Sequence, residues 1–265
     1  MMKLQFLLID PQNDFAHPQG QLYVPGADED SLRLAALLQR YSAHIEAIHV
    51  TLDTHHLVDI AHPIFWIDKN GEHPTPFTQI SAEDVQEKRW QTTKPEHQNR
   101  ALNYVETLAK NGRYQLTIWP PHCLIGTAGH NVVEPVAQAI RTWEQQSFAI
   151  ANYINKGDNI WTEHYSAVRA DVPDPKDPYT QLNTALIQTL KAADRVAISG
   201  QALSHCVANT VRDIVANFGE TQLDKLVLIE DTCSSVPGFE AWGAQFVQDM
   251  KNVGVQVIHS SDDLL

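Results

Sequence analysis

The stretch 195–218 places the strongest constraint on how this chain can fold. Its first five residues form a short, mostly apolar run that ends at Gly200, which predicts a strand buried in a parallel sheet. From Val207 onward, apolar residues recur at helical spacing, so we expect a helix that begins near Ser204. A buried strand that leads at once into a helix is typical of an α/β fold, and it places Cys206 in the first turn of that helix.

The position of Cys206 allows two interpretations. The unpaired amides and the positive end of the helix dipole favour a thiolate over a thiol, as in a nucleophile elbow that carries cysteine instead of serine. A free cysteine is also among the most buried residue types, so an inert core residue is the alternative. The rest of the chain is needed to decide between them.

The composition of the chain argues against some classes of binding partner. The chain has 265 residues, enough to bury a large core, and a formal net charge of −13 at pH 7. This charge, with a sequence pI near 5.3, argues against nucleic acid or an anionic membrane as a partner. No apolar run approaches the roughly 20 residues of a membrane span, and the run 4–9 lacks a signal-peptide cleavage site. Three widely spaced cysteines form no disulfide framework, which favours the reducing cytoplasm.

Apolar runs that alternate with helical patterns predict a layered fold. We expect six strands, at 3–9, 45–51, 148–154, 195–199, 226–230 and 255–258. Further helices are expected over 131–145, 180–191 and 239–250, and around 34–41 with Ser31 as the N-terminal cap. This alternation predicts one α/β domain over 1–265, with αβα layers and a six-stranded, mostly parallel sheet.

The alternation lapses between about 63 and 118. Prolines, glycine and polar residues dominate this segment, although one helix is expected to end near Asn111 and Gly112. A structureless loop of this length is uncommon in a compact domain, so we expect an insertion with partial structure of its own. A lid over the site and an oligomer contact both remain open as its role, and the sequence leaves a homo-oligomer open.

Three chemically active groups follow three of the expected strands: Asp10, Lys156 and Cys206. The carboxyl ends of parallel strands converge at one edge of a sheet, where ligands bind. Together these residues supply a nucleophile, a carboxylate that can take its proton, and a cation that stabilises both anions. This combination favours the nucleophilic interpretation of Cys206.

A second group consists of Asp53, His55 and His122. Alternate residues just beyond a strand can face one ion, and carboxylate with imidazole suits zinc, iron or manganese. His56 and His62 are nearby candidates for a further ligand. Since the chain has 13 histidines, a chance pair of exposed loop residues is an equally good interpretation of Asp53 and His55 alone.

These residues lie in motifs whose order along the chain resembles that of a known family. The motifs are Asp10-x-Gln-Asn-Asp-Phe15, Asp53-x-His55, Trp119-Pro-x-His122-Cys-x-x-Gly126, Lys156-Gly157 and Gly200-x-Ala202-x-x-x-Cys206-Val207. Together they closely resemble the nicotinamidase branch of the isochorismatase-like cysteine hydrolases. The resemblance covers the chain from residue 3 to about 258, except for 62–118. The family's fold, a six-stranded parallel sheet between helical layers, agrees with the strands expected above.

The resemblance implies a role for each matched residue. It implies that Asp10, Lys156 and Cys206 form a catalytic triad, and that the amides of Ala202 and Cys206, next to a cis Gln201–Ala202 peptide, bind an oxyanion. It implies aromatic pocket walls at Phe15 and Trp119, and a small-molecule amide as substrate. The implied metal ligands are Asp53, His55 and His122, joined in some members by another histidine, for which His62 is the better placed candidate. Zinc is the expected metal, with iron or manganese as alternatives.

Some positions depart from the family pattern. Gln201, Leu203 and Ser204 stand where smaller apolar or other polar residues are more usual, and Thr54 replaces an aromatic residue. The insertion is also longer than is typical. These departures leave the triad intact but leave the identity of the amide open.

Three other functions compete with a nicotinamidase. One is a metal-independent cysteine hydrolase acting on a ureido or carbamoyl compound. Another is a metallohydrolase in which a metal-bound water attacks and Cys206 is structural. The last is a non-catalytic protein that keeps the fold as a ligand-binding or carrier-domain platform.

Overall fold

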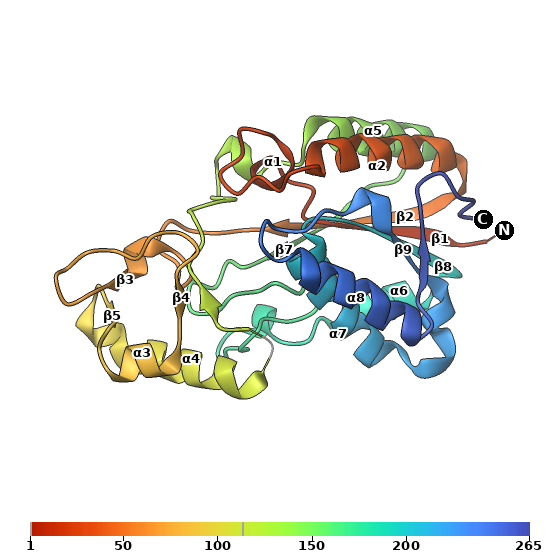
Figure 1. Cartoon of the computed structure of the whole chain (residues 1–265). Helices are drawn as coiled ribbons and strands as arrows, with labels where there is room; N and C mark the ends of the chain where they lie inside the picture. Colours follow the sequence, from red (N-terminus) through yellow and green to blue (C-terminus); the bar gives the residue numbers. More distant parts are fainter. Residues whose placement is uncertain (1, 113) are drawn as a thin grey trace.

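The computed structural model describes residues 2–112 and 114–265, and its centre is a six-stranded sheet (Figure 1). All five strand pairings are parallel, in the order β10–β9–β8–β1–β2–β7. The strands are β1 (Leu4–Ile9), β2 (Ile45–Asp53), β7 (Asn152–Lys156), β8 (Arg195–Gly200), β9 (Leu226–Ile229) and β10 (Gln256–Ile258). The expected αβα fold with a six-stranded parallel sheet is therefore confirmed.

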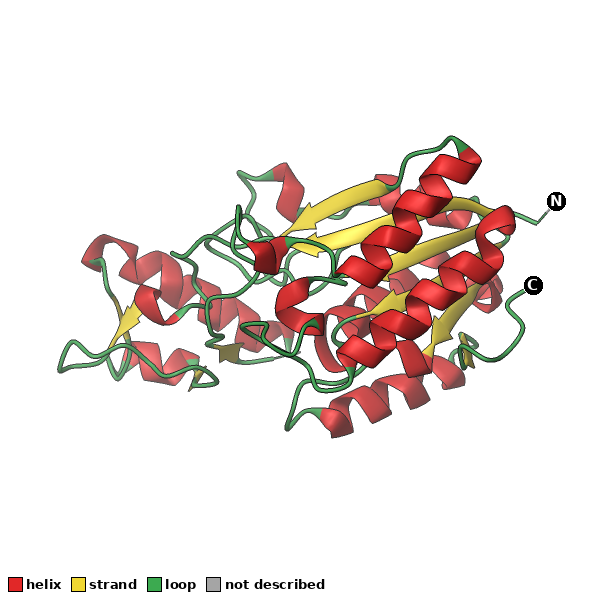
Figure 2. Cartoon of the chain, turned by 90° about the horizontal axis from the view of Figure 1, so that it is seen from above, coloured by secondary structure: helices red, strands yellow, loops and turns green. Residues whose placement is uncertain are grey.

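Helices cover both faces of the sheet. One layer contains α2 (Ala27–Tyr41) and α5 (Glu134–Ser147), and the other contains α6 (Thr184–Lys191), α7 (Ala208–Phe218) and α8 (Glu240–Asn252) (Figures 1 and 2). Because both faces are covered, all six residues of β1 are buried. This explains why β1 is an almost continuous apolar run instead of an alternating one.

Several predicted boundaries were wrong. The helices expected over 131–145 and 180–191 begin only at Glu134 and Thr184. The strand expected at 148–154 begins only at Asn152, because Phe148 closes α5 in the left-handed conformation (φ 53°) and its side chain is 99% exposed. Ser31 does not cap α2, which begins at Ala27 instead. The Ser31 hydroxyl lies inside the helix and donates to the Ala27 carbonyl at 2.7 Å. Three acidic residues at 28–30 lie in the first turn instead, where the helix dipole favours negative charge.

The chain between β2 and α5 builds a lobe beyond the carboxyl edge of the sheet (Figure 1). It contains two short antiparallel pairs, β3 with β5 and β4 with β6. Its elements are β3 (Trp66–Ile67), β4 (Gln79–Ile80), α3 (Ala82–Gln86), β5 (Gln91–Thr92), α4 (Gln98–Asn111) and β6 (Leu116–Thr117). Helix α4 ends at Gly112, whose φ of 71° suits glycine, as the sequence predicts.

A backbone hydrogen bond closes the base of this lobe. The Trp119 amide donates to the Ala61 carbonyl at 2.8 Å, so the chain returns to the sheet next to the point where it left. The two ends of the lobe therefore deliver His62 and Trp119 to the same region. Within the described residues, no helix is long and apolar enough to cross a membrane.

The central position of β1 leads to a stability prediction. We expect Phe6→Ala to lower the free energy of unfolding by about 3–5 kcal/mol, because Phe6 is fully buried in the core and its removal leaves a cavity. The matched control is Phe148→Ala, whose exposed ring should change stability by no more than about 0.5 kcal/mol. Denaturant unfolding measures both, and equal losses would contradict the packing described here.

Candidate active site

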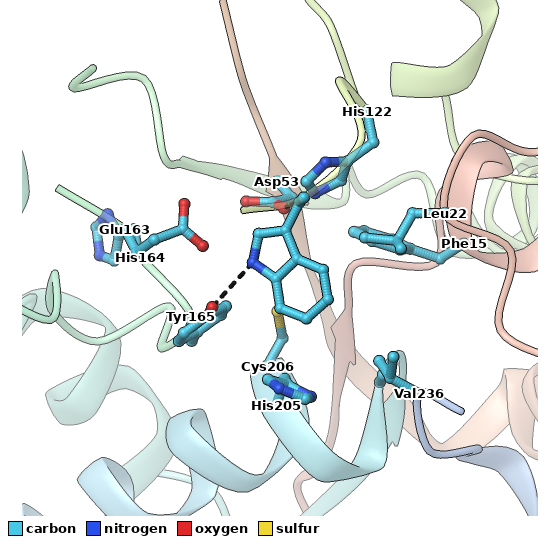
Figure 3. Close-up of a pocket in the computed structure, with 12 residues that line it drawn as sticks. Phe15, Leu22, Asp53, His122, Glu163, His164, Tyr165, His205, Cys206 and Val236 are labelled. Carbon is cyan, nitrogen blue, oxygen red and sulfur yellow. Dashed lines mark hydrogen bonds and ion pairs between the residues drawn. The ribbon is translucent and has the colours of Figure 1, made fainter. Parts of the chain in front are cut away.

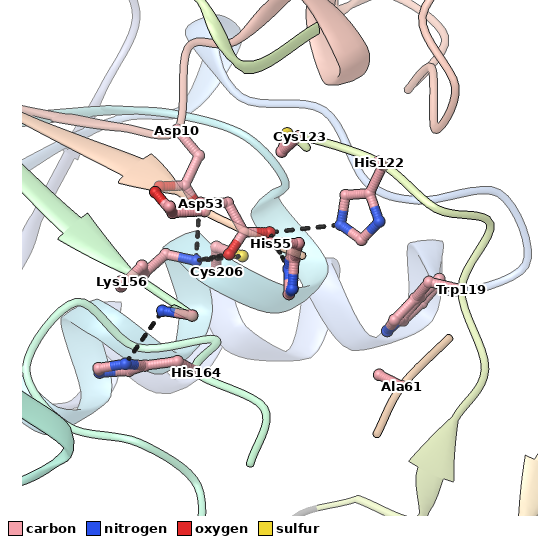
Figure 4. Close-up of polar contacts among 12 residues, drawn as sticks. Asp10, Asp53, His55, Ala61, Trp119, His122, Cys123, Lys156, His164 and Cys206 are labelled. Carbon is pink, nitrogen blue, oxygen red and sulfur yellow. Dashed lines mark hydrogen bonds and ion pairs between the residues drawn. The ribbon is translucent and has the colours of Figure 1, made fainter. Parts of the chain in front are cut away.

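The sheet brings the three predicted catalytic side chains together at its carboxyl edge. Lys156, at the end of β7, places its Nζ 2.9 Å from Asp10 Oδ2 and 3.6 Å from Cys206 Sγ (Figure 4). The same ammonium lies 2.9 Å from Asp53 Oδ1. One buried cation thus links the nucleophile, the proposed base and a proposed metal ligand.

The charges at this centre depend on one another. Burial alone would lower the pKa of Lys156, but the carboxylates of Asp10 and Asp53 raise it well above its ordinary value, so the side chain is an ammonium. Burial raises the pKa of Cys206 well above its ordinary value, against the opposing effect of Lys156. The expectation that the helix start favours a thiolate was therefore wrong for the resting protein, because desolvation dominates.

Asp10 is held as an available proton acceptor. It follows β1 in a left-handed conformation (φ 45°), and the Thr51 hydroxyl donates to its Oδ1 at 2.5 Å. Burial raises the pKa of Asp10, while Lys156 opposes that rise. A carboxylate whose proton affinity is raised in this way is suited to accept the thiol proton.

The segment that carries Cys206 is a sharp elbow. Gly200 lies so close to β1 that an added Cβ would come within 1.9 Å of the Ile9 carbonyl oxygen, and its φ is +131°. The Gln201–Ala202 peptide is cis, as the resemblance implies. The helix expected near Ser204 is first a π-helical turn over Leu203–Val207, and α7 follows it.

Asp53, His55 and His122 form a compact, buried group of metal-ligand type. Asp53 Oδ2 lies 3.1 Å from His55 Nε2 and 3.3 Å from His122 Nε2. Their ligand atoms all lie within 4.8 Å of one another, as ligands around one ion do. In both histidines, Nε2 is therefore the nitrogen that points at Asp53 Oδ2.

The second nitrogen of each ring explains this orientation. His55 Nδ1 lies 3.1 Å from Asp59 Oδ2, and His122 Nδ1 lies 2.9 Å from the Pro120 carbonyl oxygen. Because acceptors hold Nδ1–H, Nε2 is the nitrogen left to bind a metal, which is the arrangement of metal-binding histidines. Burial alone would lower the pKa of His55, but Asp53 and Asp59 raise it well above its ordinary value, so a metal would take the place of a proton on its Nε2. The donor set therefore fits a divalent metal such as zinc, with iron and manganese also compatible.

His62 has the same arrangement, whereas His56 does not. His62 is fully buried, its Nδ1 faces the Leu57 carbonyl at 3.2 Å, and its Nε2 has no partner among the described residues. Burial lowers the pKa of His62 to about 4, so the ring is neutral. Its ring centroid lies 5.2 Å from that of His55. His56 is exposed and faces Asp158 instead, so the structure separates it from the group.

A small pocket lies between Cys206 and this group (Figure 3). It is lined by Phe15, Leu22, Asp53, Trp119, His122, Glu163, His164, Tyr165, Ala202, His205, Cys206 and Val236. The Trp119 indole donates to the Tyr165 hydroxyl at 2.9 Å, which fixes one wall. Aromatic side chains beside a few polar groups are the lining expected of a site for a small ligand.

Comparisons with known proteins place this geometry in context. Neither a protein-family model nor a curated protein matches the chain by sequence. Solved structures do match. The Acinetobacter baumannii nicotinamidase/pyrazinamidase has a TM-score of 0.68 and 23% identity, covering 99% of this chain and 98% of its own. The fold is that of the nicotinamidases.

Two further structures share it. The yeast nicotinamidase bound to the inhibitor nicotinaldehyde has a TM-score of 0.67 and 19% identity, over 97% of this chain and 99% of its own. The Pyrococcus horikoshii pyrazinamidase in complex with zinc has a TM-score of 0.58 and 18% identity, over 97% of this chain and 99% of its own. The matches extend across the whole chain, so they include the lobe that the sequence motifs leave out.

The sequence analysis gave no role to several residues that shape the site. Gln12 forms two 2.7 Å hydrogen bonds with the backbone of Asp53, one in each direction. Asp14 accepts from the Cys123 amide at 2.6 Å and so holds the loop that carries His122. Both residues lie in the Asp10–Phe15 motif, and their place in that motif was the sequence feature that could have indicated their role in the site.

For Glu163, no sequence feature of this kind indicated a role in the site. It is buried in the pocket wall, its Oε1 has no partner among the described residues, and burial raises its pKa to about 8. It therefore gives the pocket a neutral carboxylic acid at pH 7. Its ligand atom groups with those of His55 and Asp59 within 4.8 Å. Only the folded chain brings it there, because its neighbours in sequence form no recognisable motif.

Gln12 leads to a prediction about metal affinity. We expect Gln12→Ala to weaken zinc binding by about 10- to 100-fold, because Asp53 loses the contacts that fix its backbone. Gln5→Ala is the matched control, since Gln5 is a buried glutamine of β1 that bonds to Glu46 and His49 and not to Asp53. Calorimetric titration with zinc measures both. Equal affinities for the two variants would contradict the positioning role, and no binding by the wild type would contradict the metal site.

Proposed function

We propose that this protein is a nicotinamidase of the isochorismatase-like cysteine hydrolases, which converts nicotinamide to nicotinate and ammonia. The observation that carries the proposal is the contact of Lys156 with Asp10 and Cys206, beside a pocket lined by aromatic side chains. The shared fold with nicotinamidases supports it. The reaction would serve the salvage of NAD in the cytoplasm.

Cys206 is the proposed nucleophile. Asp10 accepts its proton as Sγ attacks the amide carbon, and Lys156 stabilises the negative charge on both side chains. The amides of Ala202 and Cys206 are the proposed donors to the oxyanion. Among the described residues, no backbone group accepts a hydrogen bond from the Ala202 amide, which leaves it available. Loss of one such donor typically costs about 3–4 kcal/mol of transition-state stabilisation.

The second half of the reaction returns the enzyme to its starting state. Asp10 gives the proton to the leaving nitrogen, which departs as ammonia, and a thioester between Sγ and the acyl carbon remains. Asp10 then takes a proton from water, whose oxygen attacks the thioester. The acid leaves and Cys206 regains its proton, so one water is consumed for each amide cleaved.

The remaining residues hold the substrate. Phe15 and Trp119 are the proposed walls against the two faces of the ring. Asp53, His55 and His122 would hold a divalent metal, with His62 as a further ligand through its unpartnered Nε2. When bound, the metal supplies a Lewis-acidic contact that orients the pyridine nitrogen. This donor set also favours nicotinamide over the ureido or carbamoyl substrate of a metal-independent relative.

Ammonia release tests the proposal. We expect the wild type to release ammonia from nicotinamide and Cys206→Ala to release none, because the thioester cannot form. Cys206→Ala should still bind zinc and nicotinate. Cys233→Ala is the matched control, since Cys233 is a buried free thiol that does not line the pocket and whose Sγ donates to the Ile229 carbonyl, so turnover should stay intact.

Each contrary result identifies a different competitor. Activity in Cys206→Ala would support a metallohydrolase in place of the cysteine route. If the wild type releases no ammonia from nicotinamide but releases it from another amide or a ureido compound, the cysteine mechanism would stand and nicotinamide would be rejected as the substrate. If the wild type releases no ammonia from any of these compounds, the result would support a non-catalytic binding protein.

A further inference from the structure

Three hydrogen bonds tie the loop after β9 to the elbow that carries Cys206. The Leu203 amide donates to the Ser234 carbonyl at 2.7 Å, and the Ser234 amide donates to Gln201 Oε1 at 3.1 Å. The Val236 amide donates to Ser204 Oγ at 3.1 Å. The elbow partners Gln201, Leu203 and Ser204 are the three elbow residues that depart from the family pattern.

Ser204 also contacts the next side chain. Its Oγ lies 2.9 Å from His205 Nδ1, and Ser204 is almost completely buried. The Val236 amide can only donate, so Oγ is the acceptor in that bond. Among the described residues, Nδ1 is then the one remaining partner for the hydroxyl hydrogen. A buried hydroxyl that does not donate would lose a hydrogen bond, so Nδ1 accepts.

This arrangement selects one tautomer of His205. With Nδ1 as the acceptor, the proton of the neutral ring is on Nε2. Burial lowers the pKa of His205 to about 4, so the ring is neutral at pH 7. The Nε2–H group has no hydrogen-bond acceptor among the described residues. The ring is also enclosed, with centroids of Phe239 at 4.8 Å and of Trp119 and Tyr165 at 5.4 Å.

His205 lines the same cavity as Cys206. In Figure 3 these two residues lie on one side of the pocket, and Asp53 and His122 lie on the other. A ligand held against the metal-ligand group therefore has His205 on its far side. The elbow side of the pocket is otherwise apolar at Ala202 and Val236. His205 is thus the polar side chain with which this side can recognise a ligand.

We propose that Ser204 is a positioning residue that keeps His205 in its Nε2–H tautomer, and that this N–H donates to the carbonyl oxygen of the amide substrate, beside the proposed amide donors of Ala202 and Cys206. The proposal rests on the proposed function for the identity of the substrate, but the hydrogen-bond relay itself does not. The relay runs from the Val236 amide through Ser204 to the pocket. It selects a planar amide with an acceptor atom facing the elbow.

Nitrogen-15 NMR of the histidines tests the relay directly. We expect His205 Nε2 to be the protonated nitrogen in the wild type, with its signal assigned by its loss in His205→Gln. In Ser204→Ala, Nδ1 loses its donor, so a population protonated at Nδ1 should appear. Ser234→Ala is the matched control, because it removes a serine hydroxyl from the loop after β9 and keeps the backbone hydrogen bonds of residue 234 to Leu203 and Gln201. It should retain the wild-type tautomer.

The substrate contact is tested with nicotinate and by kinetics. Adding nicotinate should shift the Nε2 signal of the wild type. Ser204→Ala should lower kcat/KM for nicotinamide about three- to tenfold, as expected when one hydrogen bond to the reacting carbonyl oxygen is weakened. A general loss of structure would lower kcat and stability together, and Ser234→Ala reports that effect.

The outcomes separate this proposal from the proposed function. Protonation of His205 at Nδ1 in the wild type would overturn the relay even if nicotinamide is hydrolysed. An Nε2 signal that nicotinate leaves unmoved would overturn the ligand contact, provided that calorimetry shows nicotinate to bind. An Nε2–H tautomer that Ser204→Ala shifts would support the relay even if the wild type releases no ammonia, in which case the proposed function fails.

Discussion

The site is organised by a single buried ammonium. Lys156 contacts the carboxylates of Asp10 and Asp53 at 2.9 Å each and the sulfur of Cys206 at 3.6 Å. Two carboxylates of like charge could not stay ionised at this depth without a cation between them. Removing one partner of a buried ion pair typically costs about 3–5 kcal/mol, because the other charge is left uncompensated. The lysine therefore belongs to the stability of the sheet edge as much as to its chemistry.

A second set of contacts fixes the groups around this cation. Gln12 holds the backbone of Asp53, and Asp14 holds the loop of His122. His55, His62 and His122 each have Nδ1 engaged by an oxygen atom, so the direction of Nε2 is set before any ligand arrives. Rigid support of this kind reduces the reorganisation needed on binding.

Much of the fold and of the candidate site could be predicted from sequence, because the chemically active residues follow directly after the strands. Apolar runs locate the strands, and parallel strands bring Asp10, Lys156 and Cys206 to one edge whatever their separation along the chain. Local patterns failed where tertiary contacts decide. Nothing near Phe148 shows that its apolar neighbourhood is an exposed turn, and nothing near Ser31 shows that α2 begins at Ala27. The raised pKa of Cys206 likewise follows from burial, which a sequence pattern does not report.

The closed base of the lobe has a consequence for how this chain can change. The amide–carbonyl contact between Trp119 and Ala61 anchors both ends of the lobe at the sheet. Residues delivered to the pocket come from those anchored ends, whereas β3, β5, α3 and α4 are built between them. The lobe also supports the pocket wall, because the Tyr104 hydroxyl of α4 accepts a hydrogen bond from the Glu163 amide at 3.1 Å. Insertions and deletions in the lobe can therefore be tolerated over evolutionary time where they leave α4 against Glu163, and the rest of the lobe can acquire new contacts while the chemistry beneath it stays the same.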